Sequence, residues 1–84
     1  MPQVKIYSTT WCGFCKAQKR FLDDKGVKYE DVNVEDDQEQ AREMIRLSGQ
    51  MGVPFTVITH DDGSKIGILG FDQPRLVREL GIAA

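Results

Sequence analysis

The sequence predicts an α/β fold in which strands and helices follow the order β-α-β-α-β-β-α. Three observations lead to this order: stretches of alternating or β-branched residues, stretches whose apolar residues recur with helical spacing, and glycine or acidic residues at the boundaries. A helix joins the first two strands, so these should be parallel with a right-handed crossover, whereas a short turn makes the last two antiparallel. We therefore expect a four-stranded mixed sheet flanked by three helices.

The first half of the chain holds two expected strands and one expected helix. Residues 3–8 (QVKIYS) alternate between apolar and polar side chains, which is typical of a strand. A helix is expected from about Gly13 to Lys25, and Gly26 would end it, as glycine past a helix C-terminus usually does. Residues 29–34 (YEDVNV) form the second expected strand. The helix would bury the apolar side chains that recur along one face, which are Phe14, Ala17, Phe21 and Leu22.

A second helix and a third strand follow. The acidic stretch 36–39 supplies capping residues and favourable charge for a helix start, and this helix is expected to stop near Ser48 and Gly49. After a glycine-bearing loop, residues 55–59 (FTVIT) form a strongly β-branched strand. The helix would bury Ala41, Met44 and Ile45.

A hairpin and a third helix complete the expected fold. Residues 60–63 (HDDG) form the turn, with Asp62-Gly63 as its strongest signal, and residues 64–69 form the partner strand. Asp72 is an expected N-cap, and Pro74 lies in the first turn of the last helix. This helix would bury Leu76, Val77 and Leu80.

Length and charge limit the classes of function. A chain of 84 residues is expected to form one domain, residues 1–84. Its 11 Lys and Arg against 13 Asp and Glu give a formal net charge of −2, which provides no large basic field for nucleic acid or an anionic membrane. No apolar run approaches the ~20 residues of a membrane span, and no secretory signal is visible. We expect a compact soluble domain that binds neither nucleic acid nor membranes.

The chain has two cysteines, Cys12 and Cys15, separated by two residues. A disulfide across so short a loop adds little chain-entropy stabilisation, so the pair is better explained as working thiols in a reducing compartment such as the cytoplasm. Structural zinc needs four ligands, and His60 is the only other soft candidate, so one chain cannot assemble a zinc site. The alternative of a metal cluster shared between two chains is not excluded by the sequence.

The spacing of the pair suits redox chemistry. On helix geometry, Cα atoms three residues apart lie about 5 Å from each other, inside the window for a disulfide. Cys12 at the helix N-terminus would meet unpaired backbone N–H groups and the positive end of the helix dipole, which stabilise a thiolate. Lys16 would add positive charge one turn later, and Lys19 is a weaker candidate. Cys12 is therefore the expected nucleophile, and the more buried Cys15 the resolving thiol.

Three motifs resemble those of glutaredoxin-like proteins in the thioredoxin superfamily, and of NrdH-type redoxins in particular. They are residues 4–15 (VKIYSTTWCGFC), Gly52-Val53-Pro54 and Gly70-Phe71-Asp72, and together they span nearly the whole chain. The resemblance implies a thioredoxin-like fold of glutaredoxin size, because no room remains before Gln3 for the extra strand and helix of thioredoxin. It also implies a thiol–disulfide oxidoreductase that needs no cofactor, with glutathione as co-substrate in some members.

The resemblance also implies a substrate site. From the residues alone, a trans proline at the start of a strand is the default. The family implies instead that the Val53–Pro54 peptide is cis and lies against Cys12, with the backbone of Val53 offered to a bound peptide or glutathione. Trp11 and Phe14 would form an apolar surface beside the thiolate, although Phe14 equally fits the core side of its helix. The implied substrate-binding residues are Trp11, Phe14, Lys16, Val53, Pro54, Gly70, Phe71 and Asp72.

The sequence departs from glutathione-using members at two places. Those proteins often have a lysine three residues before the first cysteine, where this chain has Thr9, and a Gly-Gly-x-Asp-Asp stretch that residues 69–73 (LGFDQ) match only in part. Fewer charged groups mean weaker charge-assisted contacts to glutathione. The pair Gly70-Phe71 is similar to the NrdH-type pattern, whose members take electrons from thioredoxin reductase. Both thioredoxin reductase and glutathione stay open as the reductant, and Asp72 is equally explained as an N-cap.

The resemblance implies a monomer whose partners carry disulfides, such as ribonucleotide reductase or peroxidases. A second hypothesis is an iron–sulfur carrier or scaffold, because Cys12-Gly13-Phe14-Cys15 is similar to the Cys-Gly-Phe-Ser motif of glutaredoxins that bind a [2Fe–2S] cluster between two chains with two glutathiones. Cys15 stands where that motif has serine, and its presence favours redox chemistry.

Overall fold

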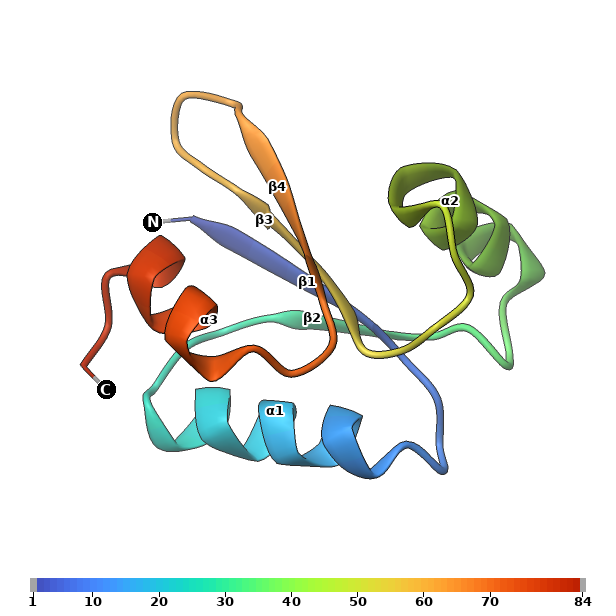
Figure 1. Cartoon of the computed structure of the whole chain (residues 1–84), viewed down its shortest axis with the longest axis horizontal. Coiled ribbons are helices and arrows are strands. Elements are labelled where there is room, and N and C mark those ends of the chain that lie inside the picture. Colours follow the sequence, from blue (N-terminus) through green and yellow to red (C-terminus); the bar gives the residue numbers. More distant parts are fainter. Residues whose placement is uncertain (1, 84) are drawn as a thin grey trace.

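The computed structural model describes residues 2–83, whose elements Figure 1 labels in chain order. These are β1 (Gln3–Ser8), α1 (Gly13–Asp24), β2 (Glu30–Asn33), α2 (Gln38–Ser48), β3 (Phe55–Thr59), β4 (Lys65–Leu69) and α3 (Gln73–Leu80). The order β-α-β-α-β-β-α predicted from the sequence is confirmed, although β2 and β4 are shorter than the expected 29–34 and 64–69. The single domain expected for residues 1–84 includes Met1 and Ala84, which lie outside the described residues.

The strands form one mixed sheet in the order β2-β1-β3-β4. β1 and β2 are parallel, with Tyr7 opposite Val32, because α1 carries the chain back to the starting edge. β3 pairs antiparallel with β1, with Phe55 opposite Tyr7, and also antiparallel with β4. Gly63 in the connecting turn has a φ of +86°, a conformation that glycine adopts without strain. This register places the end of β1 beside the start of β3.

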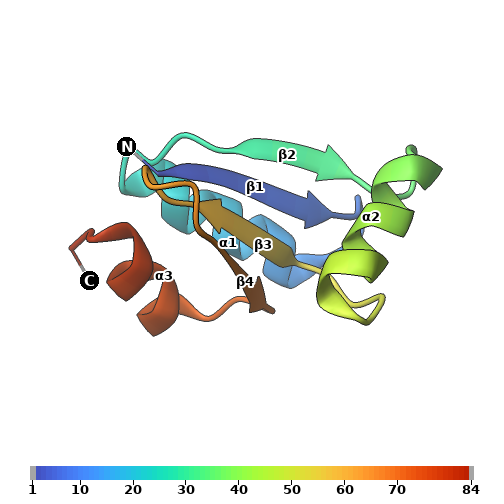
Figure 2. The same ribbon diagram turned by 90° about the horizontal axis from the view of Figure 1, so that it is seen from above.

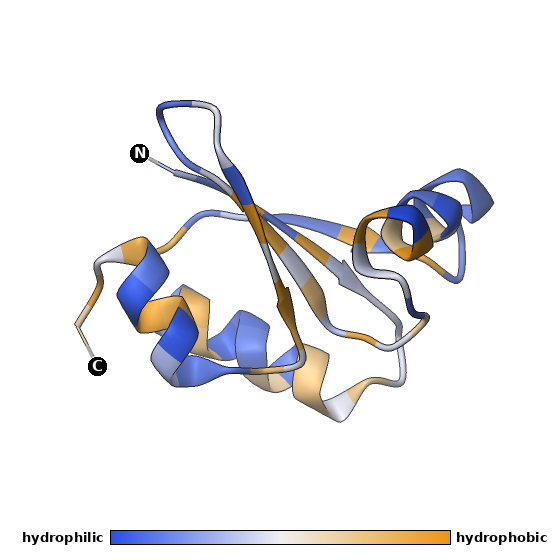
Figure 3. Ribbon diagram, turned by 45° about the horizontal axis from the view of Figure 1, so that its top comes forward, coloured by the Kyte–Doolittle hydropathy of each residue, from blue (hydrophilic) through white to orange (hydrophobic). Residues whose placement is uncertain are grey.

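Helices cover both faces of the sheet, with α1 and α3 on one face and α2 on the other (Figure 1, Figure 2). Alternation along β1 sends Ile6 to the face of α1 and α3, and Tyr7 to the face of α2. The first core cluster contains Val4, Ile6, Leu22, Ile58, Ile68 and Leu76, and the second contains Tyr7, Met44 and Phe55. Hydrophobic residues, orange in Figure 3, accordingly follow the strands of the sheet.

The buried face of α1 differs from the expected one. Cys15, Gln18 and Leu22 are fully buried, whereas Phe14 is 71% exposed and Ala17 is also exposed. Neighbouring positions lie about 100° apart around a helix, so the inward turn of Cys15 points Phe14 outward. In the first turns of α1, the buried side chains therefore lie one residue later than the sequence predicted. Of the side chains that the sequence predicted to be buried, only Leu22 is fully buried.

The other two helices bury less than the sequence suggested. Met44 of α2 is buried as expected, but Ile45 is exposed, because α2 covers only part of its sheet face. A hollow of about 720 Å³ lies on the uncovered part, lined in part by Tyr7 and Leu47. In α3, Leu76 is fully buried. The remaining expected core residues of these helices are half-buried, namely Ala41, Val77 and Leu80.

Candidate functional site

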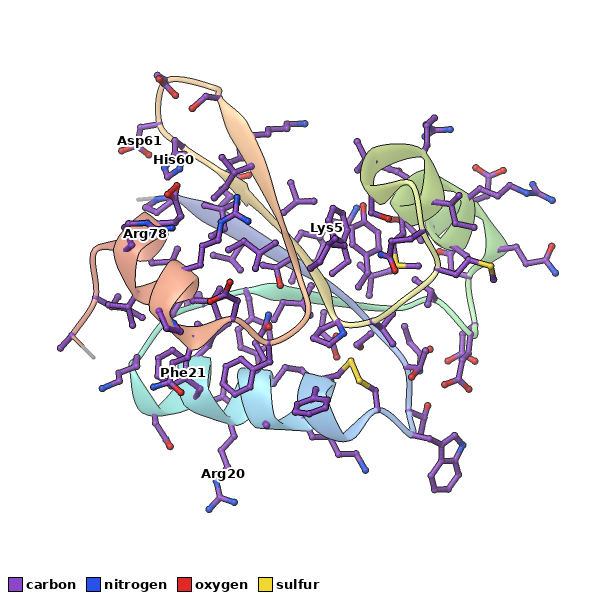
Figure 4. The ribbon with its side chains drawn as sticks, in the orientation of Figure 1. Lys5, Arg20, Phe21, His60, Asp61 and Arg78 are labelled. Atoms are coloured by element: carbon purple, nitrogen blue, oxygen red, sulfur yellow. A yellow bond between two sulfur atoms is a disulfide. The ribbon has the colours of Figure 1, made fainter. Side chains whose placement is uncertain are left out.

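The cysteine pair lies at the start of α1. Cys12 is the N-cap residue, with extended backbone angles (φ −87°, ψ 108°), and its sulfur accepts a hydrogen bond from the Cys15 backbone N–H at 3.0 Å. The two residues form a disulfide, drawn as a yellow bond in Figure 4, with their Cα atoms 5.2 Å apart. This separation agrees with the expectation from helix geometry. The predicted position of Cys12 at the helix N-terminus is confirmed.

The start of α1 favours a negative charge on Cys12. The first N–H groups of a helix have no intrahelical partner, and that of Cys15 already donates to the Cys12 sulfur. A thiolate at this position strengthens the hydrogen bond and lies at the positive end of the helix dipole. Within α1, which is described throughout, the first turn holds no acidic residue to oppose that charge. The start of α1 therefore stabilises a negative charge on the Cys12 sulfur.

Solvent access separates the two cysteines. Cys12 is half-buried, whereas Cys15 is 0% exposed. Thiol–disulfide exchange requires the attacking sulfur to reach a sulfur of the disulfide. A large partner can thus reach Cys12, while Cys15 is accessible only from within the protein.

Val53 and Pro54 lie at the same end of the sheet as the cysteine pair. Phe55, the first residue of β3, is opposite Tyr7, so the chain entering β3 runs beside the chain that leaves β1. The Val53–Pro54 peptide is cis, and Pro54 is buried. The Pro54 carbonyl accepts a hydrogen bond from the Gly70 N–H at 2.9 Å, which ties this segment to the loop before α3.

Two exposed aromatic side chains flank Cys12. Trp11 is 86% exposed, and the exposure of Phe14 removes the core explanation that the sequence had left open. Met51, three residues before Pro54, is a further exposed apolar side chain that sequence reasoning missed. Its only signal was an apolar residue in a glycine-bearing loop. The exposed rings of Trp11 and Phe14 beside Cys12 are typical of a contact surface.

The motif Gly70-Phe71-Asp72 has structural roles in this chain. Asp72 is the N-cap of α3, where its Oδ1 accepts a hydrogen bond from the Arg75 backbone N–H at 3.2 Å. Phe71 packs against Phe21, labelled in Figure 4, with ring centroids 5.9 Å apart. Gly70 has a φ of +73°, which favours glycine. The capping role of Asp72 that the sequence allowed is thus confirmed.

A hydrogen-bond network that sequence reasoning did not predict holds the loop before Cys12. The Thr10 backbone N–H donates to Glu35 Oε1 at 2.7 Å, and Asn33 Nδ2 donates to Thr10 Oγ1 at 2.9 Å. The Glu35 backbone N–H in turn donates to Asn33 Oδ1 at 2.9 Å. No local pattern signals these contacts, because they depend on the parallel pairing of β1 with β2.

The two lysines near the cysteine pair have different surroundings. Lys16 is exposed and lies one turn after Cys12. Lys19 Nζ lies 2.9 Å from Asp31 Oδ2, and Asp31 Oδ1 accepts a hydrogen bond from Ser8 Oγ at 2.6 Å. Lys19 therefore joins α1 to β2, and Asp31 offsets its charge.

The described residues contain no metal-binding cluster. Among residues 2–83, no group of three or more His, Cys, Asp or Glu side chains is arranged to hold a metal ion. His60 lies 3.8 Å from Glu79, at the hairpin end of the molecule in Figure 4. In the same part of the chain, no helix has the length and apolar character needed to cross a membrane.

Comparison with known proteins agrees with this geometry. The family model for glutaredoxin matches residues 4–61, which is more than half of the chain and includes both cysteines. The protein belongs to the glutaredoxin family. A glutaredoxin-like 8.6 kDa protein from the rubredoxin operon of Clostridium pasteurianum is 42% identical over 73 residues, which covers 87% of this chain and 91% of that protein. Glutaredoxin 3 of Escherichia coli K12 is 33% identical over 67 residues, covering 80% and 77%.

Solved structures agree with the assignment of this glutaredoxin-family chain. The NrdH-redoxin of Escherichia coli, described as a glutaredoxin-like protein with a thioredoxin-like activity profile, superposes with a TM-score of 0.70 at 29% identity. The match covers 98% of this chain and 99% of that one. The predicted thioredoxin-like fold is therefore confirmed. The family catalyses thiol–disulfide exchange, so this glutaredoxin-family protein is a thiol–disulfide oxidoreductase that carries a linked Cys12–Cys15 pair.

Proposed function

We propose that this glutaredoxin-family protein reduces disulfides of proteins or small molecules, with Cys12 as the nucleophile and Cys15 as the resolving thiol. The observation that carries this proposal is the difference in access: Cys12 is partly exposed to solvent at the start of α1, whereas Cys15 is fully buried. A substrate sulfur can be attacked by Cys12, and Cys15 can break only the bond that Cys12 has formed.

The reaction proceeds by two exchanges. The Cys12 thiolate attacks one sulfur of the substrate disulfide, forms a mixed disulfide and expels the other sulfur as a thiolate, which takes a proton from solvent. Cys15 then loses its proton to solvent and attacks the Cys12 sulfur, which releases the second substrate thiolate. Two electrons have passed to the substrate, and the Cys12–Cys15 disulfide remains.

Substrate binding is assigned to the surface around the nucleophile. Trp11 and Phe14 supply exposed apolar area, and Lys16 supplies positive charge. The backbone of Val53, just before the buried Pro54, offers hydrogen-bonding groups to an extended substrate segment by strand addition. This arrangement favours protein disulfides that lie in exposed, extended segments.

Thioredoxin reductase is the proposed reductant. Thr9 replaces the lysine that glutathione-using members often have, and the Asp72 carboxylate is engaged in capping α3. Phe71 is packed against Phe21. Few charged groups are therefore free to bind the carboxylates and the ammonium group of glutathione. The thioredoxin-like activity profile described for the related NrdH-redoxin supports the same reductant.

The test compares two reductants on the oxidised protein. One reaction contains NADPH and thioredoxin reductase, and the other contains NADPH, glutathione and glutathione reductase. We expect fast reduction only with thioredoxin reductase. A Thr9→Lys variant is the matched control, because restoring the cation should raise the rate with glutathione. Fast reduction of the wild-type protein by glutathione would contradict the proposed reductant.

The proposed substrates are cytoplasmic enzymes that form a disulfide in each turnover, such as ribonucleotide reductase or a peroxidase. A single-domain monomer with a partly exposed nucleophile suits such partners. We expect purified wild-type protein to sustain turnover of one of these enzymes when NADPH and thioredoxin reductase are present. A Cys15→Ser variant should stop turnover and form a mixed disulfide with the same enzyme. Failure to support either enzyme would exclude these substrates.

The alternative hypothesis, a [2Fe–2S] carrier or scaffold, makes a different prediction. It requires Cys12 of two chains and two glutathiones and leaves Cys15 unused, whereas Cys15 is paired with Cys12 in this fold. We expect protein purified anaerobically and incubated with iron, sulfide and glutathione to stay colourless and monomeric. A coloured dimer would establish the carrier function.

A further inference from the structure

Gln18 is a fully buried polar residue on the inner side of α1. Its Nε2 donates a hydrogen bond to Thr56 Oγ1 of β3 at 2.6 Å, and Thr56 is fully buried as well. The other polar atom of the amide, Oε1, is buried without a hydrogen-bond partner among the described residues. Buried polar groups in folded proteins are nearly always hydrogen-bonded, so this free oxygen requires an explanation.

The neighbour of Gln18 on the buried side of the helix is Cys15. Residues three apart on a helix have Cβ atoms about 5–6 Å from each other, and both of these side chains are 0% exposed. Thr56 lies two residues after Pro54 and anchors the amide from the sheet. The unpaired oxygen of Gln18 and the sulfur of Cys15 are therefore both shielded from solvent on the same side of α1.

We propose that Gln18 Oε1 accepts a hydrogen bond from the Cys15 thiol when the disulfide is reduced. In the disulfide form the Cys15 sulfur carries no hydrogen, and the oxygen is left unpaired. Reduction supplies the donor that the oxygen lacks, because a thiol S–H is a weak hydrogen-bond donor. Gln18 is thus a positioning residue for the redox pair, an inference that rests on the proposed roles of Cys12 and Cys15.

The atoms and electrons of this step balance with a dithiol as reductant. The S–S bond between Cys12 and Cys15 breaks, an S–S bond forms in the reductant, and two electrons pass to the protein. The reductant gives up two protons. One proton is taken up by the Cys15 sulfur and the other enters solvent, because Cys12 is favoured as a thiolate.

This contact acts in opposite ways on the two redox states. The reduced protein gains a hydrogen bond inside the core, whereas the oxidised protein carries an unpaired oxygen. The equilibrium therefore lies further toward the dithiol than it would with an apolar residue at position 18. Cys15 also keeps its proton until a mixed disulfide forms at Cys12.

The first test is the redox equilibrium of Gln18→Met against a matched control, Gln40→Met. Gln40 has the second buried, unpaired amide oxygen among the described residues, but it lies on α2, on the opposite face of the sheet. The equilibrium with a dithiothreitol redox buffer should shift about tenfold toward the disulfide in Gln18→Met, or about 30 mV more negative, and stay unchanged in Gln40→Met. Equal shifts in both variants would overturn the inference.

The second test observes the thiol itself. A Cys12→Ser variant leaves Cys15 as the single thiol, and a hydrogen bond lowers the frequency of its S–H infrared stretching band. We expect this band at lower frequency in Cys12→Ser than in the double variant Cys12→Ser/Gln18→Met. Equal frequencies would overturn the inference. Neither test contains a reductase or a substrate protein, so the result is independent of the reductant and substrates proposed above.

A third variant pair covers the case in which Gln18→Met does not fold. Thr56→Val leaves Gln18 in place but removes the oxygen that anchors its amide, whereas Thr56→Ser keeps that oxygen. We expect Thr56→Val to shift the redox equilibrium toward the disulfide and Thr56→Ser to behave as the wild-type protein. If Thr56→Val has the same redox equilibrium as the wild-type protein, the anchored amide of Gln18 does not act on that equilibrium, and the inference is overturned.

Discussion

The carboxylate of Glu35 accepts a hydrogen bond from the backbone N–H of Thr10 at 2.7 Å, which joins the chain after β2 to the loop that presents Cys12. Asn33 holds the hydroxyl of the same threonine at 2.9 Å. The loop before the nucleophile is thus fixed by side chains more than 20 positions further along the sequence. Trp11 is the residue that follows Thr10 in this loop.

Replacing Glu35 should loosen the loop and weaken substrate binding. We expect Glu35→Ala to raise KM for a protein disulfide about three- to tenfold with little change in kcat, and to destabilise the fold by about 1 kcal/mol, because one hydrogen bond to a charged acceptor is lost. Glu35→Gln keeps an acceptor oxygen and should stay near the wild-type KM. Steady-state kinetics and urea unfolding measure both effects. A wild-type KM in Glu35→Ala would show that the attachment is not needed for substrate binding.

Trp11 and Phe14 should contribute to docking and not to stability. Both are largely exposed, so we expect Trp11→Ala and Phe14→Ala to change the free energy of unfolding by no more than about 0.5 kcal/mol. KM for a protein disulfide should rise, since apolar contact area is lost. Leu47→Ala, an exposed apolar residue of α2, is the control and should leave KM unchanged. Equal KM values in all three variants would contradict the docking role.

The two cysteines should respond differently to replacement by serine. Cys12→Ser should abolish turnover, because the buried Cys15 cannot reach a substrate disulfide. Cys15→Ser should still attack and then accumulate a mixed disulfide that is visible by mass spectrometry under non-reducing conditions. The reverse pattern, with accumulation in Cys12→Ser, would exchange the two roles.

Asp72 should act on stability through the start of α3. We expect Asp72→Ala to destabilise the fold by about 1 kcal/mol, because the hydrogen bond from the Arg75 N–H is lost, and Asp72→Ser to restore most of that stability. Urea unfolding checks this result. If Asp72→Ser regains stability but glutathione reduces it more slowly than it reduces the wild-type protein, Asp72 binds glutathione in addition to capping the helix.

Tyr29 should make stability fall at high pH. Its partial burial, its hydrogen bond to Asp23 and the charges of Asp23 and Asp31 raise the pKa of Tyr29 from 10.0 to about 12. The folded protein thus holds the phenol proton more tightly than the unfolded chain does, which gives stability that is full below pH 10.0 and is lost as the pH rises toward about 12. The free energy of unfolding of Tyr29→Phe should fall less steeply over this window. Identical slopes in urea titrations would contradict the shifted pKa.

The strand and turn positions were largely predictable because their signals are local. The strands Gln3–Ser8 and Phe55–Thr59 have the bounds that alternation and β-branching predicted. Gly26 and Gly49, which were expected to end two helices, have φ values of +70° and +73°. Such residues report on the backbone at their own position, so no long-range contact is needed to interpret them.

The orientation of α1 was not predictable from its composition. Phe14 and Ala17 continue the apolar pattern of Phe21, yet the polar Gln18 occupies the core and Phe14 faces solvent. Gln18 is acceptable there because Thr56 accepts a hydrogen bond from its amide across a sequence separation of 38 residues. A pattern of apolar residues on one helix contains no information about such a partner.

The sequence by itself determined the order of the elements, the parallel pair of the first two strands, the antiparallel pair of the last two, and a cysteine pair whose spacing at a helix start permits a disulfide with Cys15 as the more buried member. The tertiary structure alone decided that β1 pairs with β3, which face of α1 is buried, and which side chains hold the loop before Cys12. The physical reason is the range of the interactions. Propensity, capping and turn geometry act over a few residues, whereas burial and hydrogen-bond pairing depend on segments that meet only when the sheet has formed.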